Sequence, residues 1–203
     1  RLFFITSIAF LLLFFESCRS AKYLDDDQAL VTKIELEGVP THLKEQAAQY
    51  ISNEIRPNSA LNLTIYNIFN TKDGRYKQDN LRQVGEPPRV LDTSLMELSA
   101  LQIQRFLHTR GYFRAQVSPF VITSQKKAKI NFQASPDSIF RIGKVSSSFD
   151  NTFIENIYKQ EVLPESKLKE GLPYNVNHLA ELRESLYTSL RNEGYFDYLR
   201  QYM

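Results

Sequence analysis

Leu107-His108-Thr109-Arg110-Gly111-Tyr112-Phe113 is the stretch that decides the fold, because its Leu-x-x-x-Gly-Tyr-Phe form recurs at residues 190–196 as Leu-Arg-Asn-Glu-Gly-Tyr-Phe. Each copy follows a helix-like segment. A glycine just past the last helical turn takes the left-handed conformation that closes a helix. The Tyr-Phe pair would then turn apolar surface toward the core at the entry to a strand. Two copies predict a repeated module, with the signature residues Gly111, Tyr112, Phe113, Gly194, Tyr195 and Phe196.

The residues before the first copy predict a strand and then helical segments. Residues 29–37 alternate between apolar and charged side chains, which is typical of a half-buried strand. Thr41 can cap a helix that runs to about Ile55, with an apolar face formed by Leu43, Ala47, Tyr50, Ile51 and Ile55. Residues 61–66 fit either an extended or a short helical segment. The polar stretch 72–88 predicts a surface loop.

A further helix leads into the first copy of the motif, and a hairpin follows it. Ser94 and Glu97 form a capping box for a helix that stops at Gly111. Its apolar side carries Leu95, Met96, Ala100, Ile103, Phe106 and Leu107. Residues 114–123 and 126–134 predict a hairpin. Its second arm directs Ala128, Ile130 and Phe132 to one side, and Lys127, Lys129 and Asn131 to the other.

The order strand, helix, helix, strand, strand then begins again. Residues 139–145 read as a strand, and Thr152 and Glu155 form another capping box, for a helix with Phe153, Ile154, Ile157 and Tyr158 on its apolar side. Gly171-Leu172-Pro173-Tyr174-Asn175 precedes the next helix, which is expected to bury Leu179, Leu182, Leu186 and Leu190. No hairpin follows the second Gly-Tyr-Phe. We therefore expect a first domain over residues 29–135 and an incomplete second domain over residues 136–203.

This β-α-α-β-β unit, with Gly-x-Pro ahead of its second helix and Gly-Tyr-Phe after it, resembles a POTRA domain. The resemblance covers about residues 29–203. It implies tandem modules of α+β class, each a small mixed sheet with helices on one face, from an outer-membrane assembly protein of the BamA/TamA family. Pro57-Asn58, the stretch 61–67 and the Gly85-Glu86-Pro87-Pro88 loop resemble the Bacteroidetes-type members. A β-barrel is expected in such a protein, and no alternating strands of that kind occur in these residues.

The chain opens with an apolar run, residues 2–15, that is short for a membrane span but fits a secretory signal. Ser17-Cys18 follows directly, like the processing site of a bacterial lipoprotein, so we expect a signal over residues 1–18 and acylation of Cys18. Phe15 and Glu16 depart from that pattern, and an ordinary signal with an incidental cysteine is the alternative. Residues 19–28, with Asp25-Asp26-Asp27, predict a solvated tether.

Composition excludes several classes of function. The 203 residues carry a net charge of +2, which gives no reason to expect a nucleic-acid partner. A single cysteine and three scattered histidines offer no metal-ligand spacing, and we expect no cofactor. The sequence contains no Ser/His/Asp arrangement and no phosphate-binding glycine loop, and Tyr112 and Tyr195 are better read as core anchors than as proton donors. We expect no enzymatic activity.

The resemblance implies binding. An edge strand has unpaired backbone groups that accept an extended peptide by strand addition, and the candidate edges are residues 29–37 and 114–123, the latter interrupted by Pro119. The expected partners are unfolded outer-membrane or secreted clients, other subunits of the assembly machinery and the outer membrane itself, on its periplasmic side. The alternatives are a free-standing scaffold lipoprotein and a module of a two-partner secretion or cell-division protein.

Overall fold

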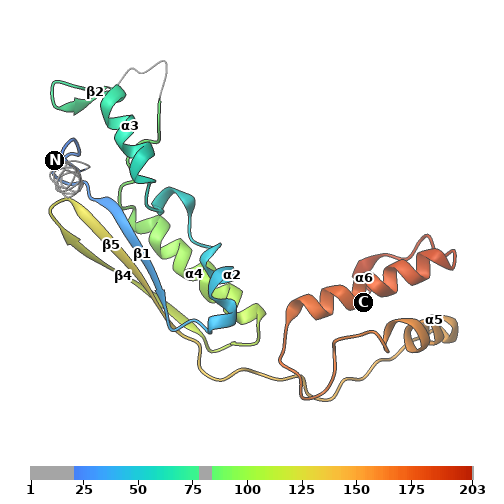
Figure 1. Cartoon of the computed structure of the whole chain (residues 1–203). Coiled ribbons are helices and arrows are strands. Elements are labelled where there is room, and N and C mark those ends of the chain that lie inside the picture. Colours follow the sequence, from blue (N-terminus) through green and yellow to red (C-terminus); the bar gives the residue numbers. More distant parts are fainter. Residues whose placement is uncertain (1–20, 78–83, 203) are drawn as a thin grey trace, which may run out of the picture. The chain divides into compact units, whose positions relative to one another are not determined.

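The computed structural model describes residues 21–77 and 84–202 (Figure 1). These residues form two compact units. The first unit contains residues up to 103 together with 117–135, and the second contains residues 104–116 together with the chain from 136 onward. The predicted domains, 29–135 and 136–203, differ from these units in one segment, since residues 104–116 group with the second unit. The predicted signal and Cys18 lie outside the described residues.

The first unit is built on a mixed sheet of three strands, β1 (Leu30–Glu37), β4 (Gln116–Ser124) and β5 (Lys127–Ser135). Their order is β1-β5-β4, with β1 parallel to β5. A two-residue turn joins β4 to β5, and both turn residues, Gln125 and Lys126, have the positive φ that such a hairpin requires. The predicted strand 29–37, the hairpin and the α+β class are confirmed.

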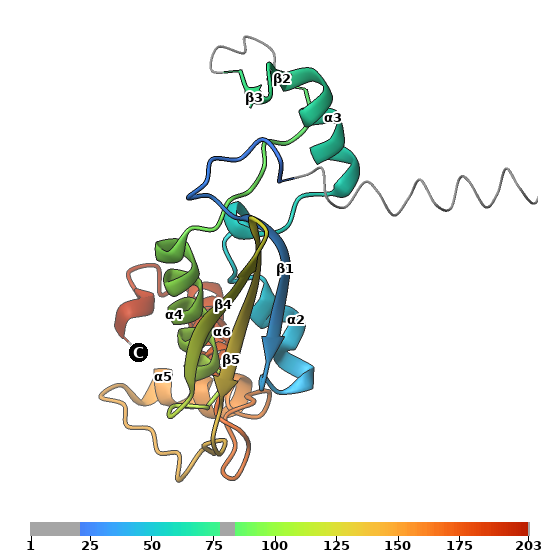
Figure 2. The ribbon, with the colours of Figure 1, turned by 90° about the vertical axis from the view of Figure 1, so that its left-hand side faces the viewer.

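Helices cover one face of this sheet, where α2 (Lys44–Ala48) and α4 (Thr93–Thr109) lie on the same side (Figure 2). Under them the inward side chains of β5, Ala128, Ile130 and Phe132, have no exposed surface, as predicted. On the other face Lys129 is half-buried and forms an ion pair with Glu35, whereas Asn131, predicted to share the face of the lysines, is buried.

One predicted helix is wrong. The span from Thr41 to Ile55 is divided into a 3-10 turn η2 (Thr41–Leu43), the short helix α2 and a second 3-10 turn η3 (Asn53–Ile55). Thr41 is not the cap, because Pro40 holds that position. Ser52 breaks the helix with an extended ψ of 136°, and its amide instead donates to Ser99 Oγ at 3.0 Å. Four of the five residues of the predicted apolar face are buried, and the fifth, Tyr50, is exposed.

The ambiguous segment after Pro57 forms a helix, α3 (Ala60–Asn70). A small hairpin of β2 (Thr71–Lys72) and β3 (Arg75–Tyr76) follows, so the predicted surface loop begins with paired strands. Its turn residues, Asp73 and Gly74, both have positive φ, which suits the Asp-Gly pair. The helix capping box at Ser94 is also corrected, because Asp92 Oδ1 accepts the Leu95 amide at 3.0 Å.

Residues 21–28, predicted as a solvated tether, pack onto the first unit. Ala21 and Leu24 are buried in a cluster with Leu30 and Leu63, although the three aspartates are exposed. Lys126 holds this segment by donating to the Leu24 carbonyl at 2.8 Å and pairing with Asp26 at 2.7 Å. The apolar side chains at positions 21 and 24 bind it to α3.

The second unit is mainly helical, with α5 (Thr152–Ile157), a π-helical turn η4 (Tyr158–Val162), α6 (Val176–Asn192) and a 3-10 turn η5 (Arg200–Tyr202). The strand predicted at 139–145 is wrong, because this stretch forms only an isolated bridge between Arg141 and Pro173. Asn151, not Thr152, caps α5. The core contains Ile157, Tyr158, Val162, Leu182, Leu186 and Leu190, whereas Leu179 and Phe153, both expected on buried faces, are exposed.

The described part of the chain contains no helix that is both long and apolar enough to cross a bilayer.

Candidate functional site

The two strands that the sequence offers as candidate edges, β1 and β4, are the two edges of the three-stranded sheet (Figure 1). An edge strand presents unpaired amide and carbonyl groups that template the addition of another strand. The sequence left the choice between these edges open. Their surroundings in the structure differ, and the difference favours β1.

The β4 edge is poorly suited to a long ladder. Pro119 lies in its middle and removes one backbone donor. Phe120 and Ile122 are exposed on β4, at 46% and 58% of their surface. This edge therefore offers apolar side chains rather than a continuous row of hydrogen-bonding groups.

The β1 edge already carries a short piece of the chain itself. The Val31 amide donates to the Arg89 carbonyl at 2.9 Å, and the Leu91 amide donates to the Ala29 carbonyl at 2.8 Å. Leu30 and Val90 form the antiparallel bridge between these two bonds. Residues 89–91 thus occupy the first part of the β1 edge and show that it accepts an antiparallel strand.

Pro87 and Pro88 prevent this self-pairing from continuing, because they have no amide hydrogen. Asn58 fixes the chain at the same point. Its Nδ2 donates to the Pro87 carbonyl at 2.9 Å, and its Oδ1 accepts the Arg89 amide at 2.8 Å. We call Asn58 with residues 87–89 the Asn58 clamp. Among the described residues, no strand pairs with the outer edge of β1 beyond Val31.

The loop before the clamp is seated on α3 by close backbone contacts. Gly85 has a φ of +86°, and a Cβ atom there would lie 2.6 Å from both the Asn62 carbonyl oxygen and the Tyr66 amide nitrogen. Asn62 Nδ2 donates to Glu86 Oε1 at 3.1 Å, and Asn70 Nδ2 donates to the Val84 carbonyl at 3.0 Å. Only glycine fits at position 85, so the packing of the loop on α3 requires the glycine of the Gly85-Glu86-Pro87-Pro88 stretch.

A groove of about 700 Å³ lies between the open part of β1 and α2. Apolar side chains from both elements line it, including Ile34, Leu36 and Ala48. Lys44 and Arg56 border it against a single acid, Glu45, while the ammonium group of the lining residue Lys33 pairs with Glu35. The Arg56 guanidinium is also structural, since it donates to the Ala48 carbonyl at 2.8 Å and the Ile51 carbonyl at 3.1 Å. The groove is apolar inside and basic at its rim.

Two lysines fix the carboxylate of Glu35 on the opposite face of β1. Lys129 Nζ lies 2.7 Å from one carboxylate oxygen and Lys33 Nζ 2.8 Å from the other. These contacts, with Lys129 contributing most, hold the pKa of Glu35 below its usual range. The bridge ties β1 to β5 and stiffens the edge that borders the groove.

The repeated motif closes both long helices in the same way. Gly111 and Gly194 have φ values of 89° and 90°. The Tyr112 amide donates to the Leu107 carbonyl at 3.1 Å, and the Tyr195 amide donates to the Leu190 carbonyl at 2.9 Å. With the glycine amides bonded to the carbonyls of His108 and Arg191, each copy is a Schellman motif. The repeated Leu supplies the carbonyl that this cap needs.

The aromatic pair after each glycine does not act as one anchor. Tyr112 is buried and Tyr195 packs on the core of the second unit. Phe113 and Phe196, in contrast, are exposed. Phe113 still contacts the rings of Phe140 and Tyr174, at centroid distances of 5.3 and 4.9 Å. These contacts join residues 104–116 to the other segment of the second unit, which begins at residue 136.

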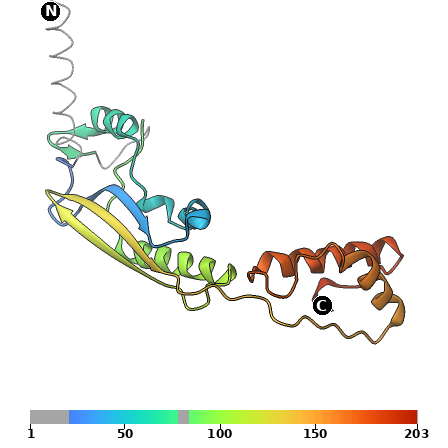
Figure 3. The same ribbon diagram turned by 60° about the horizontal axis from the view of Figure 1, so that its bottom comes forward.

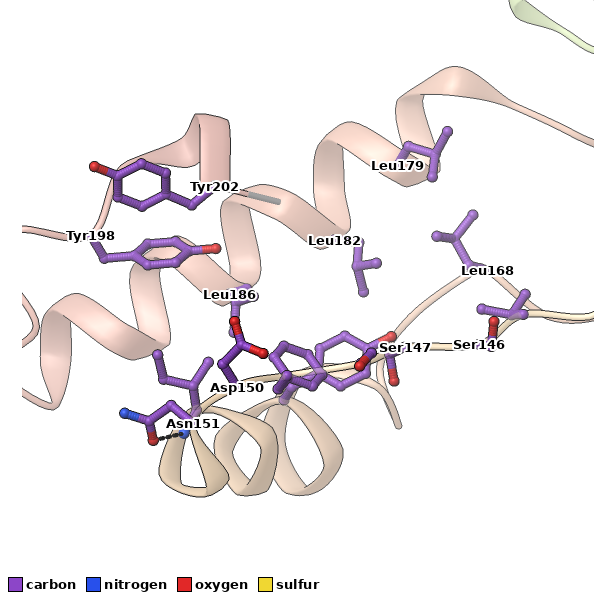
Figure 4. Close-up of a pocket in the computed structure, with 15 residues that line it drawn as sticks. Ser146, Ser147, Asp150, Asn151, Leu168, Leu179, Leu182, Leu186, Tyr198 and Tyr202 are labelled. Carbon is purple, nitrogen blue, oxygen red and sulfur yellow. Dashed lines mark hydrogen bonds between the residues drawn. The ribbon is translucent and has the colours of Figure 1, made fainter.

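A pocket of about 580 Å³ lies in the second unit (Figure 4). Leu182 and Leu186 of α6 form its apolar wall, and Tyr198 and Tyr202 border it. Asp150 is the only carboxylate among its lining residues, which include no histidine and no lysine. In the described residues no group of three or more His, Cys, Asp or Glu side chains is arranged to hold a metal ion.

No known family profile and no curated protein matches the chain. Solved structures that resemble it include the N-terminal domain of Omp85 from the thermophilic cyanobacterium Thermosynechococcus elongatus. That match has 16% sequence identity and a TM-score of 0.23, and it covers 81% of this chain and 87% of the other. A likeness this distant carries no argument for a fold, for a family or for tandem modules.

Proposed function

We propose that this chain is a periplasmic POTRA-like module of a factor that assembles or translocates outer-membrane proteins, and that it holds unfolded client or partner chains by strand addition. The open part of the β1 edge beside an apolar groove is the observation that carries this proposal. Main-chain hydrogen bonds supply affinity with little dependence on sequence, which suits a module that handles many clients. Acylation of Cys18 would keep the module at the periplasmic side of the outer membrane.

The incoming strand would run antiparallel to β1, in line with residues 89–91, and would end where Pro88 begins. Alternate side chains of a strand point to opposite faces. Every second side chain would therefore enter the groove beside Ile34, Leu36 and Ala48. Lys44 at the rim would favour an acidic residue in the client.

Binding of a labelled peptide to the full chain in mild detergent tests this proposal. The probe alternates valine and phenylalanine with serine and aspartate. Ala48→Trp fills the groove from a half-buried position and should weaken binding at least about tenfold. Gln46→Trp on the same helix does not line the groove and should leave affinity within about twofold. Unchanged binding by Ala48→Trp would overturn the assignment to this groove.

The scaffold alternative has one observation in its favour, the exposed pair Phe120 and Ile122 on β4. Exposed apolar side chains surrounded by polar residues are typical of surfaces that contact other proteins. Phe120→Ser would weaken a scaffold that docks folded partners and leave peptide binding at β1 unchanged. The scaffold alternative would be favoured if the unmodified chain bound no peptide and Phe120→Ser abolished its binding to a folded partner.

A further inference from the structure

Helix α3 is apolar on both of its faces. Its eleven residues, Ala60–Asn70, include no charged side chain. Leu63, Tyr66 and Asn70 form the buried face. The outward face nonetheless carries Leu61, Ile68 and Phe69, which are 68%, 67% and 57% exposed, with Ile65 half-buried between them. Asn62, Thr64 and Asn67 separate the two apolar faces. An exposed apolar stripe of this kind, formed here by Leu61-Ile65-Ile68-Phe69, is typical of an interaction surface.

Exposed cations lie on the segments next to the stripe. Lys72 and Arg75 belong to the β2–β3 hairpin that directly follows α3, and Lys22 lies in the segment that packs on it. Lys77 Nζ donates to the Phe69 carbonyl at 2.9 Å, which places an ammonium group at the end of the stripe. Exposed aspartates, Asp73 in the hairpin and Asp25-Asp26-Asp27 in the N-terminal segment, lie on the same segments. Apolar residues flanked by lysine and arginine are typical of a helix that lies in a membrane interface.

The N-terminal segment is bound to this same helix. Ala21 and Leu24 share a buried cluster with Leu63. Tyr76 joins them, with its ring 5.8 Å from that of Tyr23 and 5.6 Å from that of Tyr66. Its hydroxyl donates to Asn67 Oδ1 at 2.8 Å, and burial raises the pKa of Tyr76 to about 12. Figure 3 shows α3 and the hairpin at the end of the first unit where this segment begins.

The length of chain between Cys18 and Ala21 fixes how far a lipid anchor can be from α3. Three residues span at most about 11 Å. If Cys18 is acylated, its acyl chains enter the bilayer within that distance of Ala21. If the apolar run 2–15 is retained instead, the chain leaves the membrane at nearly the same residue. In both cases the bilayer that holds the anchor lies close to the segment that packs on α3.

We propose that the Leu61-Ile65-Ile68-Phe69 stripe of α3, with its neighbouring cations Lys22, Lys72, Arg75 and Lys77, is a membrane-docking surface that lies flat on the bilayer holding the N-terminal anchor. The apolar side chains enter the acyl boundary, and the basic side chains contact lipid phosphates. A single anchor point would let the module rotate relative to the membrane. A second contact through α3 fixes the orientation of the first unit relative to the membrane.

The chain contains no tryptophan, so a single introduced one reports on its own position. The experiment adds vesicles of phosphatidylethanolamine and phosphatidylglycerol to full chains carrying Phe69→Trp or Leu98→Trp. Leu98 is an exposed apolar residue on α4, at 45% against 57% for Phe69, and serves as the control. We expect the emission of Phe69→Trp to shift to shorter wavelength and to be quenched by brominated acyl chains, while Leu98→Trp stays unchanged.

Two results would overturn this proposal. Equal responses at both positions would mean non-specific adsorption. No response at position 69 in vesicle-bound protein would mean that the stripe is covered by something other than lipid. In a Cys18→Ser background, Ile68→Asp should lower vesicle binding at least about tenfold, whereas Leu98→Asp should not. These substitutions lie at exposed positions, so retained helicity by circular dichroism confirms that each variant is folded.

Discussion

The amide of Arg89 donates to Asn58 Oδ1 at 2.8 Å, across 31 positions of the sequence. This bond, with the one from Asn58 Nδ2 to the Pro87 carbonyl, sets the place where the chain's own loop meets β1 and where it leaves. A single side chain thereby divides the β1 edge into a covered part and an open part. The division creates the site to which we assign client binding.

Removal of this side chain tests the clamp. Asn58→Ala leaves a partly buried backbone amide and a carbonyl without their partner, so we expect a loss of about 1–3 kcal/mol in unfolding free energy. Hydrogen exchange at the Val31 and Leu91 amides should accelerate as residues 89–91 detach. Asn62→Ala is the control, because the hydrogen bond of the Asn62 side chain goes to the Glu86 side chain rather than to the loop backbone. Equal exchange rates in both variants would contradict the role of the clamp.

The two glycines of the repeated motif form a natural comparison. Both have φ near 90°, where alanine costs about 1–2 kcal/mol. A Cβ at Gly111 would also lie 2.9 Å from the Tyr174 carbonyl, whereas at Gly194 it would meet nothing within 4 Å. Gly111→Ala should therefore destabilise the chain by at least about 1 kcal/mol more than Gly194→Ala. Chemical denaturation measures the difference, and equal losses would show that residues 104–116 do not pack as described.

The positions of α4, α5 and α6 were predicted from sequence periodicity, but the starts of α4 and α5 were not. Ser94 and Thr152 fit the capping-box pattern, yet Asp92 and Asn151 make the caps. Several neighbouring residues could each cap the same helix, and the local pattern does not choose among them. The strand order could be anticipated because the first strand and the hairpin of a β-α-α-β-β unit leave two edges. The role of Asn58 could not be anticipated, because it depends on residues far away in the sequence.

Alanine substitutions at both candidate caps distinguish the two assignments for α4. Asp92→Ala removes the acceptor for the Leu95 amide and should cost about 0.5–2 kcal/mol. Ser94→Ala should be neutral within about 0.5 kcal/mol, because serine makes no cap there and alanine favours the helix. Thermal or urea unfolding of the two variants provides the comparison. A larger loss for Ser94→Ala would restore the capping box that the sequence suggests.

The bridge of Glu35 with Lys129 and Lys33 should make the stability of the sheet depend on pH. The pKa of Glu35 is lowered in the folded chain from its ordinary value of 4.5, first by the Lys129 hydrogen bond and then by that of Lys33. The unfolded chain therefore takes up the proton at higher pH than the folded chain does. The stabilisation is complete above pH 4.5 and is lost as pH falls through the lower folded-state pKa.

The difference in unfolding free energy between the unmodified chain and Glu35→Gln, measured across this range, should shrink toward acid pH. Glu37→Gln provides a control on the same strand. A difference that stays constant with pH would mean that the lysines do not hold the Glu35 carboxylate in solution.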